Sequence, residues 1–238
     1  MGKLAMILLP VFMVLTSAAA SANNCLLIDD FTSGQVRSSL RTPNTSDTKT
    51  QTGSMLGGVR GTLFLINTNS FLQPAEMDVD KPNNNGVPLV VTTGLRTGFR
   101  LDMEYGVDTN FVTKPLGYFP TGCDRFRVHF DSASQVLNFN ILVFQQNGFQ
   151  HHFQDGINLD PSPFTNPFCV DFLFANFAGG LPNDTEDFAG QGIAVIDFIF
   201  QTGSAIGGNE FAVTRIETLD STTAGANPCA IVAPPLGS

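Results

Sequence analysis

The chain of 238 residues has no tryptophan, only two tyrosines and only four lysines, and 14% of its residues are charged. Twelve Lys and Arg stand against 21 Asp and Glu, which gives a formal charge of −9. Because so little basic charge is present, a phosphate-binding surface is excluded as the leading function, and we expect no nucleic-acid partner. The shortage of Trp and Tyr also argues against a broad aromatic platform for stacking sugar rings.

Common catalytic signatures are also missing. The sequence contains neither a G-x-S-x-G elbow nor an H-E-x-x-H zinc motif. Gly53 and Gly58 have the glycine spacing of a P-loop, but Val59 and Arg60 occupy the Lys and Ser/Thr positions. We therefore expect a protein without enzymatic activity.

Residues 1–22 have the pattern of an export signal. A basic start at Lys3 precedes an apolar run from Leu4 to Leu15 and a small-residue end at Ala20-Ser-Ala22. The run is shorter than the roughly 20 residues that span a bilayer. We predict a signal peptide over 1–22 and a secreted, extracellular or periplasmic domain over 23–238 that does not insert into a membrane.

Hydrophobic residues make up 42% of the chain, 22 of them phenylalanine, and beyond residue 22 they alternate with polar residues or form short runs between turn residues. This pattern predicts strands. The sequence predicts an all-β antiparallel sandwich or jelly roll of about ten strands. The expected strands are 26–31, 36–42, 59–67, 87–93, 97–105, 125–131, 136–145, 168–174, 192–201 and 210–219.

Four cysteines follow the predicted signal, and an even number in an exported chain indicates two disulfides. Three connectivities are possible. Because the ends of a sandwich come together, we favour Cys25–Cys229, with Cys123–Cys169 as the second pair.

Charged residues alternate with apolar ones in the segments 99–105 and 125–131. With 137–143, these segments are expected to form three strands of one sheet with a shared polar face. Arginine and carboxylate side chains can hydrogen-bond sugar hydroxyls, and arginine can also bind an anionic ligand, although cross-strand charge pairing on a solvated face would give the same pattern. The candidate ligand-binding residues are Arg100, Asp102, Glu104, Arg125, Arg127 and His129.

An acidic pair at the first expected strand and acids near the last one suggest a structural calcium site. A strand-ending turn would explain the same pair. The candidate ligands are Asp29, Asp30, Glu217 and Asp220.

The segment Leu27-Ile-Asp-Asp-Phe31 and the element Gly57-Gly-Val-Arg60 together resemble uncharacterised exported bacterial β-sandwich proteins, some of which carry a C-terminal PEP-type sorting tail. This chain has no such motif. The opening is also similar to galactose-binding-like carbohydrate-binding jelly rolls. The second resemblance implies a sandwich with glycan or calcium sites.

Three hypotheses follow. The first is an exported, non-catalytic β-sandwich that binds, or forms part of, a surface or matrix component. The second is a carbohydrate-binding module, with or without calcium. The third is a glycoside hydrolase with an unrecognised acid pair, for which Asp102 and Glu104 are the candidates.

Overall fold

The computed structural model describes residues 23–79, 89–146, 151–159, 167–179, 187–202, 208–226, 229 and 231–232; residues 151–159 and 231–232 are described by their backbone. The predicted signal peptide lies outside these residues. Within them, no helix has the length and apolar character needed to cross a membrane.

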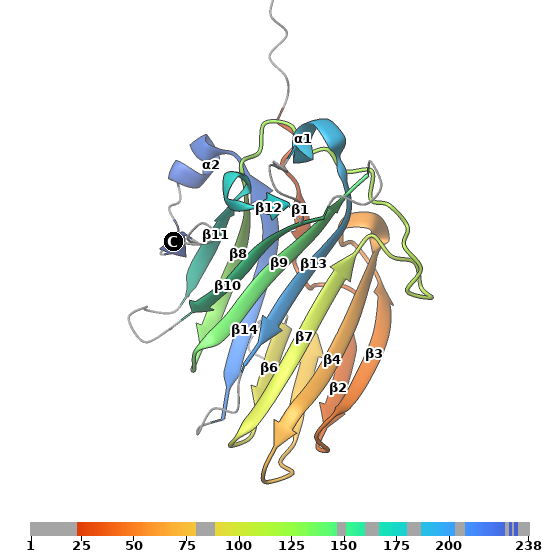
Figure 1. The fold of residues 1–238 in the computed structure, drawn as a ribbon, viewed down its shortest axis with the longest axis vertical. Helices are drawn as coiled ribbons and strands as arrows, with labels where there is room; N and C mark the ends of the chain where they lie inside the picture. Colours follow the sequence, from red (N-terminus) through yellow and green to blue (C-terminus); the bar gives the residue numbers. More distant parts are fainter. Residues whose placement is uncertain are drawn as a thin grey trace, which may run out of the picture.

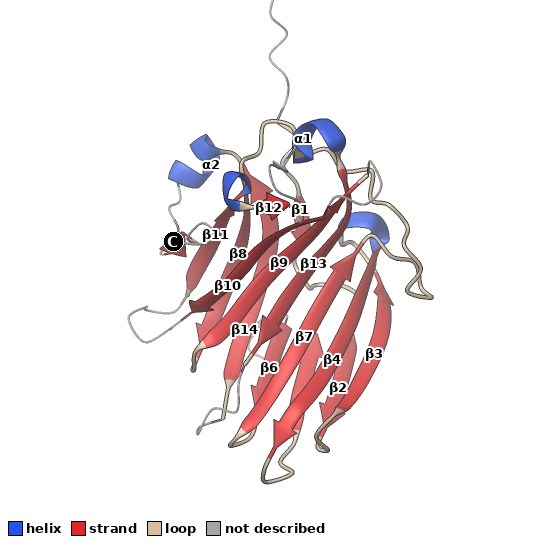
Figure 2. Ribbon diagram, viewed as in Figure 1, coloured by secondary structure: helices blue, strands red, loops and turns tan. Residues whose placement is uncertain are grey.

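The described residues are almost entirely strands, with a few short helical turns gathered toward one end (Figure 2). The strands are β1 (Leu27–Asp29), β2 (Val36–Leu40), β3 (Thr45–Thr52), β4 (Val59–Asn69), β5 (Ala75–Val79), β6 (Leu89–Thr93), β7 (Thr97–Tyr105), β8 (Arg125–Ala133), β9 (Leu137–Gln145), β10 (His151–Leu159), β11 (Phe168–Leu173), β12 (Ala178–Gly179), β13 (Ile193–Gln201), β14 (Glu210–Leu219) and β15 (Ile231–Val232). The helices are η1 (Leu56–Gly58), η2 (Phe174–Asn176), α1 (Phe188–Gln191) and α2 (Ser221–Ala226).

The strands form two sheets packed face to face, which confirms the predicted all-β sandwich (Figure 1). One sheet has the order β12-β10-β9-β13-β7-β4-β3. The other has the order β15-β11-β8-β14-β6-β5-β2, with β1 also paired to β14. All pairs are antiparallel except β11 with β15.

The expected strand segments correspond to ten of these strands, and β7 and β14 have the predicted bounds. The strands β3, β5, β10, β12 and β15 were not predicted. The segment of β3 is polar throughout, and β5 alternates apolar and acidic residues but is only five residues long. One prediction of arrangement was wrong. β7 and β9 lie in the seven-stranded sheet, whereas β8 lies in the eight-stranded sheet. Apolar and polar residues alternate along all three strands as predicted, but the polar sides of these strands lie on two different sheets.

Phenylalanine side chains from both sheets fill the space between the layers. Phe139 of β9 stacks on Phe200 of β13 with ring centroids 4.3 Å apart, and it meets the edge of Phe172 of β11 at 4.8 Å. Each of these side chains is at most 1% exposed. The Phe-rich composition therefore supplies the core rather than a surface, as its strand positions predict.

The disulfides join Cys25 to Cys123 and Cys169 to Cys229, so the favoured pairing was wrong. Strand neighbours explain both bonds. The segment before β1 is bound to the loop before β8, where Asn24 N donates to Thr121 O at 2.8 Å. Cys229 lies just before β15, which pairs with β11, the strand that carries Cys169.

Candidate functional site

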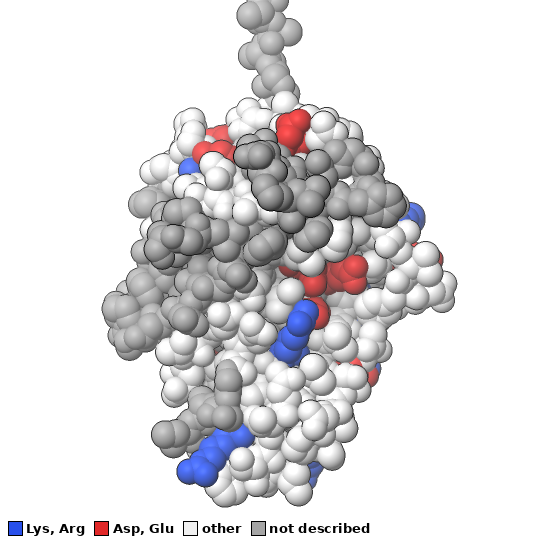
Figure 3. All heavy atoms as spheres, viewed as in Figure 1, with Lys and Arg blue, Asp and Glu red and all other residues white. Residues whose placement is uncertain are grey.

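The outer face of the seven-stranded sheet carries a row of carboxyl groups at its centre. Arg100, Asp102 and Glu104 alternate along β7 with side chains that enter the core. Asp197 of β13 lies directly opposite Glu104 across the strand pair. Figure 3 views this face, where acidic atoms gather beside a basic side chain near the middle. Arg100 Nε donates to Asp102 Oδ1 at 2.6 Å.

These carboxyl groups perturb one another. Burial, followed by the charges of Asp102 and Glu104, raises the pKa of Asp197 to about 8 despite the opposing effect of Arg100. Burial, followed by the charge of Asp102, also raises the pKa of Glu104. Asp197 therefore holds a proton at neutral pH, which lets its carboxyl group both donate and accept a hydrogen bond.

A row of side-chain amides on β9 and β13 continues this polar face toward one end of the seven-stranded sheet. Gln201 Nε2 and Asn140 Nδ2 both donate to Asn138 Oδ1, at 2.8 and 3.0 Å. Asn140 Oδ1 and Asp197 Oδ1 are shielded from solvent and make no hydrogen bond. Buried polar atoms without partners are rare in folded proteins, so these two oxygens mark this face as a candidate ligand site.

A loop over residues 106–118 rises over the same face and turns back to the start of β13. Gly106, at φ +99°, begins the loop, and a Cβ there would lie 2.2 Å from the Ala194 carbonyl oxygen. The Leu116 N–H donates to that carbonyl at 3.0 Å. The loop also places the Phe111 ring on Gly61 of β4, where a Cβ would lie 2.6 Å from the ring. Only glycine fits both positions without a shift.

A cavity of about 390 Å³ lies where this loop meets the ends of β9 and β13. This volume falls within the range of about 300–1,000 Å³ that is usual for small-molecule sites. The cavity is lined by Glu104, Thr113, Pro115, Phe144, Gln145, Gln146, Ala194 and Val195. Gln145 is 2% exposed, and neither of its side-chain polar atoms is hydrogen-bonded.

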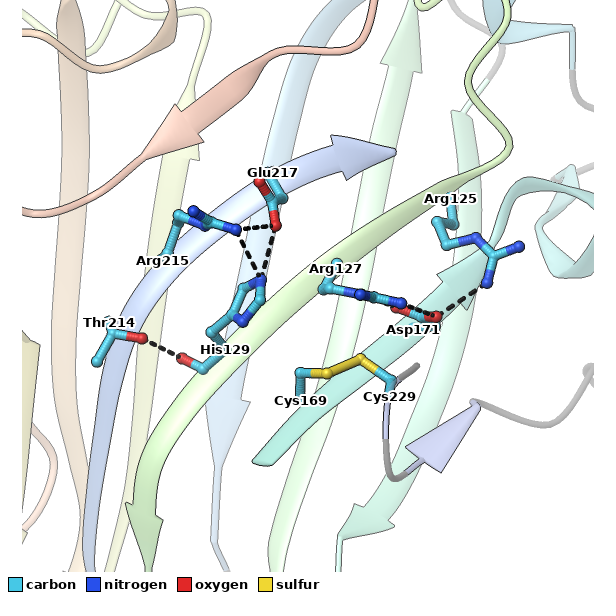
Figure 4. The surroundings of a disulfide bond; sticks show 9 residues. All are labelled: Arg125, Arg127, His129, Cys169, Asp171, Thr214, Arg215, Glu217 and Cys229. Atoms are coloured by element: carbon cyan, nitrogen blue, oxygen red, sulfur yellow. Dashed lines mark hydrogen bonds and ion pairs between the residues drawn. A yellow bond between two sulfur atoms is a disulfide. The ribbon is translucent and has the colours of Figure 1, made fainter. Parts of the chain in front are cut away.

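The other predicted ligand residues lie on the opposite side of the molecule, on the outer face of the eight-stranded sheet (Figure 4). Arg127 is 1% exposed and binds both oxygens of Asp171, at 2.6 and 2.8 Å. Arg125 contacts the same carboxylate at 2.9 Å and also pairs with Asp124. Both guanidinium groups are therefore already paired with carboxylates of the protein itself.

His129 belongs to a second ion-paired group on that face. Its Nε2 lies 2.7 Å from Glu217 Oε1, which also accepts a hydrogen bond from Arg215. Burial raises the pKa of Glu217, but hydrogen bonds from His129 and Arg215 outweigh it and leave that pKa lowered. The six predicted ligand residues therefore divide into two groups of three on opposite faces.

The four predicted calcium ligands do not come together. Asp29 is 1% exposed and accepts hydrogen bonds from Arg60 at 2.6 Å and Tyr105 at 2.8 Å. Asp30 accepts from Thr32 at 2.6 Å. Glu217 pairs with His129, as described above. In the described part of the chain, no group of three or more His, Cys, Asp or Glu is arranged to hold a metal ion.

Asp220, the fourth of these residues, immediately precedes α2. Its Oδ1 accepts from the Thr223 N–H at 2.7 Å, and its Oδ2 accepts from Asn23 at 2.7 Å. It therefore acts as a helix cap and as an anchor for the N-terminal segment.

Two residues of the site were not predicted. Asp197 is the one acid in the otherwise apolar run Ile193–Phe200, and a charge at such a position was the available signal. Gln145 gave no signal, because a polar residue at a strand end is common.

No family model matches the chain, and no curated protein matches it. Solved structures of similar shape include a family 11 carbohydrate-binding module from Clostridium thermocellum in complex with a β-1,3-1,4-mixed-linked tetrasaccharide. This match has 13% sequence identity and a TM-score of 0.38, and it covers 84% of this chain and 98% of that chain. The agarase AgWH50C matches with 10% identity, a TM-score of 0.43, and coverage of 83% and 25%. TmCBM61 in complex with β-1,4-galactotriose matches with 8% identity, a TM-score of 0.29, and coverage of 66% and 88%. Because these similarities are low, we base the proposed function on this chain's own residues.

Proposed function

We propose that this protein is an exported, non-catalytic glycan-binding β-sandwich, and that the outer face of its seven-stranded sheet binds the glycan. The unpaired oxygens of Asp197 and Asn140 on this face carry the proposal. A sugar hydroxyl both donates and accepts hydrogen bonds, so it can satisfy an amide oxygen and a protonated carboxyl group alike.

The composition of the face supports this ligand. Half-buried Leu63, Leu65 and Ile199 flank the polar row and offer apolar area to the C–H groups of a sugar ring. Pockets that bind small organic ligands combine such apolar area with a few placed polar groups. The two disulfides support export, because such bonds persist in oxidising compartments.

A saturable-binding screen tests the proposal. The mature protein is applied to an array of neutral and acidic polysaccharides, with calcium and with EDTA. Binding to at least one glycan is expected, and Asn140→Ala should weaken it about tenfold, the effect of losing a hydrogen bond worth about 1.4 kcal/mol. Arg125→Ala, on the opposite face, is the control and should bind normally.

Each alternative outcome has a meaning. No binding to any glycan under either condition would refute glycan recognition. Equal losses in the two variants would refute the placement of the site. Binding only with calcium would show that a metal takes part.

A second candidate, glycoside hydrolysis, is favoured by one observation, the directly opposed Glu104 and Asp197. Retaining glycosidases use two carboxyl groups about 5 Å apart. A raised pKa suits the acid of such a pair, Asp197, but the nucleophile must be ionised, and burial and the charge of Asp102 work against ionisation of Glu104 by raising its pKa. We expect no release of reducing ends from any bound glycan; release that Glu104→Gln abolishes would establish the enzyme instead.

A further inference from the structure

Two neighbouring turns at one end of the sandwich expose large apolar side chains. One turn joins β4 to β5 over residues 70–74, and the other joins β6 to β7 over residues 94–96, both at the end away from α1 and α2 (Figure 1). Phe71 and Leu72 are 56% and 58% exposed in the first turn, and Leu95 is 46% exposed in the second. Exposed apolar residues are ordinary when scattered singly, so three on adjoining turns indicate a contact surface.

Hydrogen bonds join these two turns to each other and to a third. Gln73 Oε1 accepts a hydrogen bond from the Leu95 N–H at 2.8 Å. Asn69 Nδ2 donates to Gln73 O at 2.7 Å and to Arg41 O at 2.8 Å, which ties in the turn between β2 and β3, residues 41–44. The exposed apolar and basic side chains of the three turns, which we call the turn cluster, are Arg41, Phe71, Leu72, Leu95 and Arg96.

The backbone of the turn cluster is strained at two of these residues. Leu72 and Arg96 both have φ +51°, in the left-handed region that side chains other than asparagine and aspartate rarely adopt. Asparagine or glycine would form either turn with less strain, so turn formation alone does not explain the Leu and Arg side chains. Strain of this kind is concentrated at functional sites. The Arg96 guanidinium also lies 5.9 Å from the centre of the Phe71 ring, which places a positive charge beside the apolar side chains.

The turn cluster is basic on an acidic protein. The chain has a formal charge of −9, whereas the three turns contain two arginines, both exposed, and no Asp or Glu. On the adjoining strands, Glu76 is paired with Arg37 at 3.2 Å, and Glu210 begins β14 beside β6. Salt screens exposed charges that are more than about 10 Å apart, so the arginines of the cluster decide what it attracts.

We propose that the turn cluster docks the protein on a bilayer surface that contains anionic lipids. Apolar side chains flanked by arginine suit such a surface, because the apolar groups enter the boundary between headgroups and acyl chains while guanidinium groups bind lipid phosphates. A stable protein interface uses about 20 residues on each side, more than five side chains on turn tips supply. The contact is peripheral and made by turn side chains, and it is separate from the proposed glycan site.

Vesicle sedimentation tests the docking. The mature protein is mixed with vesicles of phosphatidylcholine, alone or with phosphatidylglycerol added. We expect binding to the mixed vesicles that weakens as salt is added, and binding to phosphatidylcholine alone that is at least about tenfold weaker. Binding to the two kinds of vesicle with equal affinity would overturn the role of the arginines, and no binding to the mixed vesicles would overturn lipid docking altogether.

Two variants separate docking from stability. Leu72→Asn removes an apolar side chain and Arg96→Asn removes a charge, and each should weaken binding to the mixed vesicles about fivefold. Asparagine tolerates the left-handed φ at both positions, so the melting temperature should be unchanged or higher. Parent-like vesicle binding by both variants, or a melting temperature that falls in both, would overturn the proposal.

Two residues outside the turn cluster provide matched controls. Leu27 of β1 is 46% exposed, and the side chain of Arg215 of β14 is also 46% exposed. Leu27→Asn and Arg215→Asn repeat the two chemical changes away from the turns and should bind the mixed vesicles as the parent protein does. Losses of affinity equal to those of the cluster variants would overturn the placement of the docking surface.

The outcomes also separate a lipid surface from a second copy of this chain, and docking from glycan binding. Sedimentation equilibrium of the parent protein and Leu72→Asn without vesicles measures self-association. A parent dimer that Leu72→Asn dissociates, with no binding to the mixed vesicles, would overturn lipid docking and assign the turn cluster to a dimer interface. Because these vesicles carry no sugar, their result is independent of the glycan array.

Discussion

Replacing Asp197 with asparagine should change how stability depends on pH. In the unfolded chain this carboxyl group has a pKa near 3.8, whereas in the folded protein burial and then the charges of Asp102 and Glu104 raise it to about 8. The folded state therefore keeps a proton that the unfolded state releases. Because the folded state binds more protons between these values, the free energy of unfolding should fall as pH rises from about 4 to 8.

The size of the effect follows from the two values. Between pH 3.8 and pH 7 the folded state holds the extra proton throughout, at about 1.36 kcal/mol per pH unit, which gives about 4 kcal/mol. Asparagine resembles the protonated acid and cannot ionise. Asp197→Asn should therefore match the parent protein near pH 4 and exceed its stability by up to about 4 kcal/mol at pH 7.

Urea unfolding of both proteins at pH 4.5, 6, 7 and 8 measures the difference, and the other titrating groups cancel because both proteins contain them. Asp47→Asn is the opposite control. Burial raises the pKa of Asp47, but hydrogen bonds from Lys49 and Ser38 outweigh it and leave that pKa lowered, so this variant should be less stable than the parent by an amount that stays nearly constant at these pH values, all of which lie above 3.8. A difference between Asp197→Asn and the parent that stays constant with pH would refute the reasoning.

Three further predictions concern stability and connectivity. Arg60→Met leaves Asp29 as a buried charge without its ion-pair partner and should cost about 3–5 kcal/mol in urea unfolding; a loss under 1 kcal/mol would contradict this. Arg127→Met removes one of the two arginines that pair with Asp171 and leaves Arg125, so it should cost less than Arg60→Met, about 1.5–3 kcal/mol, while the folded fraction keeps its glycan affinity; selective loss of affinity would move the site to the eight-stranded sheet. Peptide mapping without reduction should recover the two disulfides described above, and recovery of a bond between the first and last cysteines would show that the strand pairing at the termini is wrong.

The alternation along each strand was readable from sequence because it is local. Successive side chains of a strand point to opposite faces, so a period of two assigns Phe99 and Leu101 to the core and Arg100 and Asp102 to the outside without knowledge of any partner strand. The same logic correctly assigned the phenylalanines of other strands to the interior. It also supported the overall class, since many short alternating segments with turn residues between them form a sandwich.

Strand neighbours could not be read in this way. Nothing in the segments 97–105 and 125–131 states that they belong to different sheets, because both show the same period and the same charges. The disulfide pairing depended on the same missing information. Pairing is settled by how the whole set of strands buries its apolar faces, a property of no single segment.

The sequence by itself therefore determined the all-β class and which side of each strand meets the core. The tertiary structure alone brought Asp197 opposite Glu104 and placed Gln145 at the cavity beside them. Residues 41 and 93 positions apart meet because β13 pairs with both β9 and β7, and such long-range contacts depend on the packing of the complete sandwich.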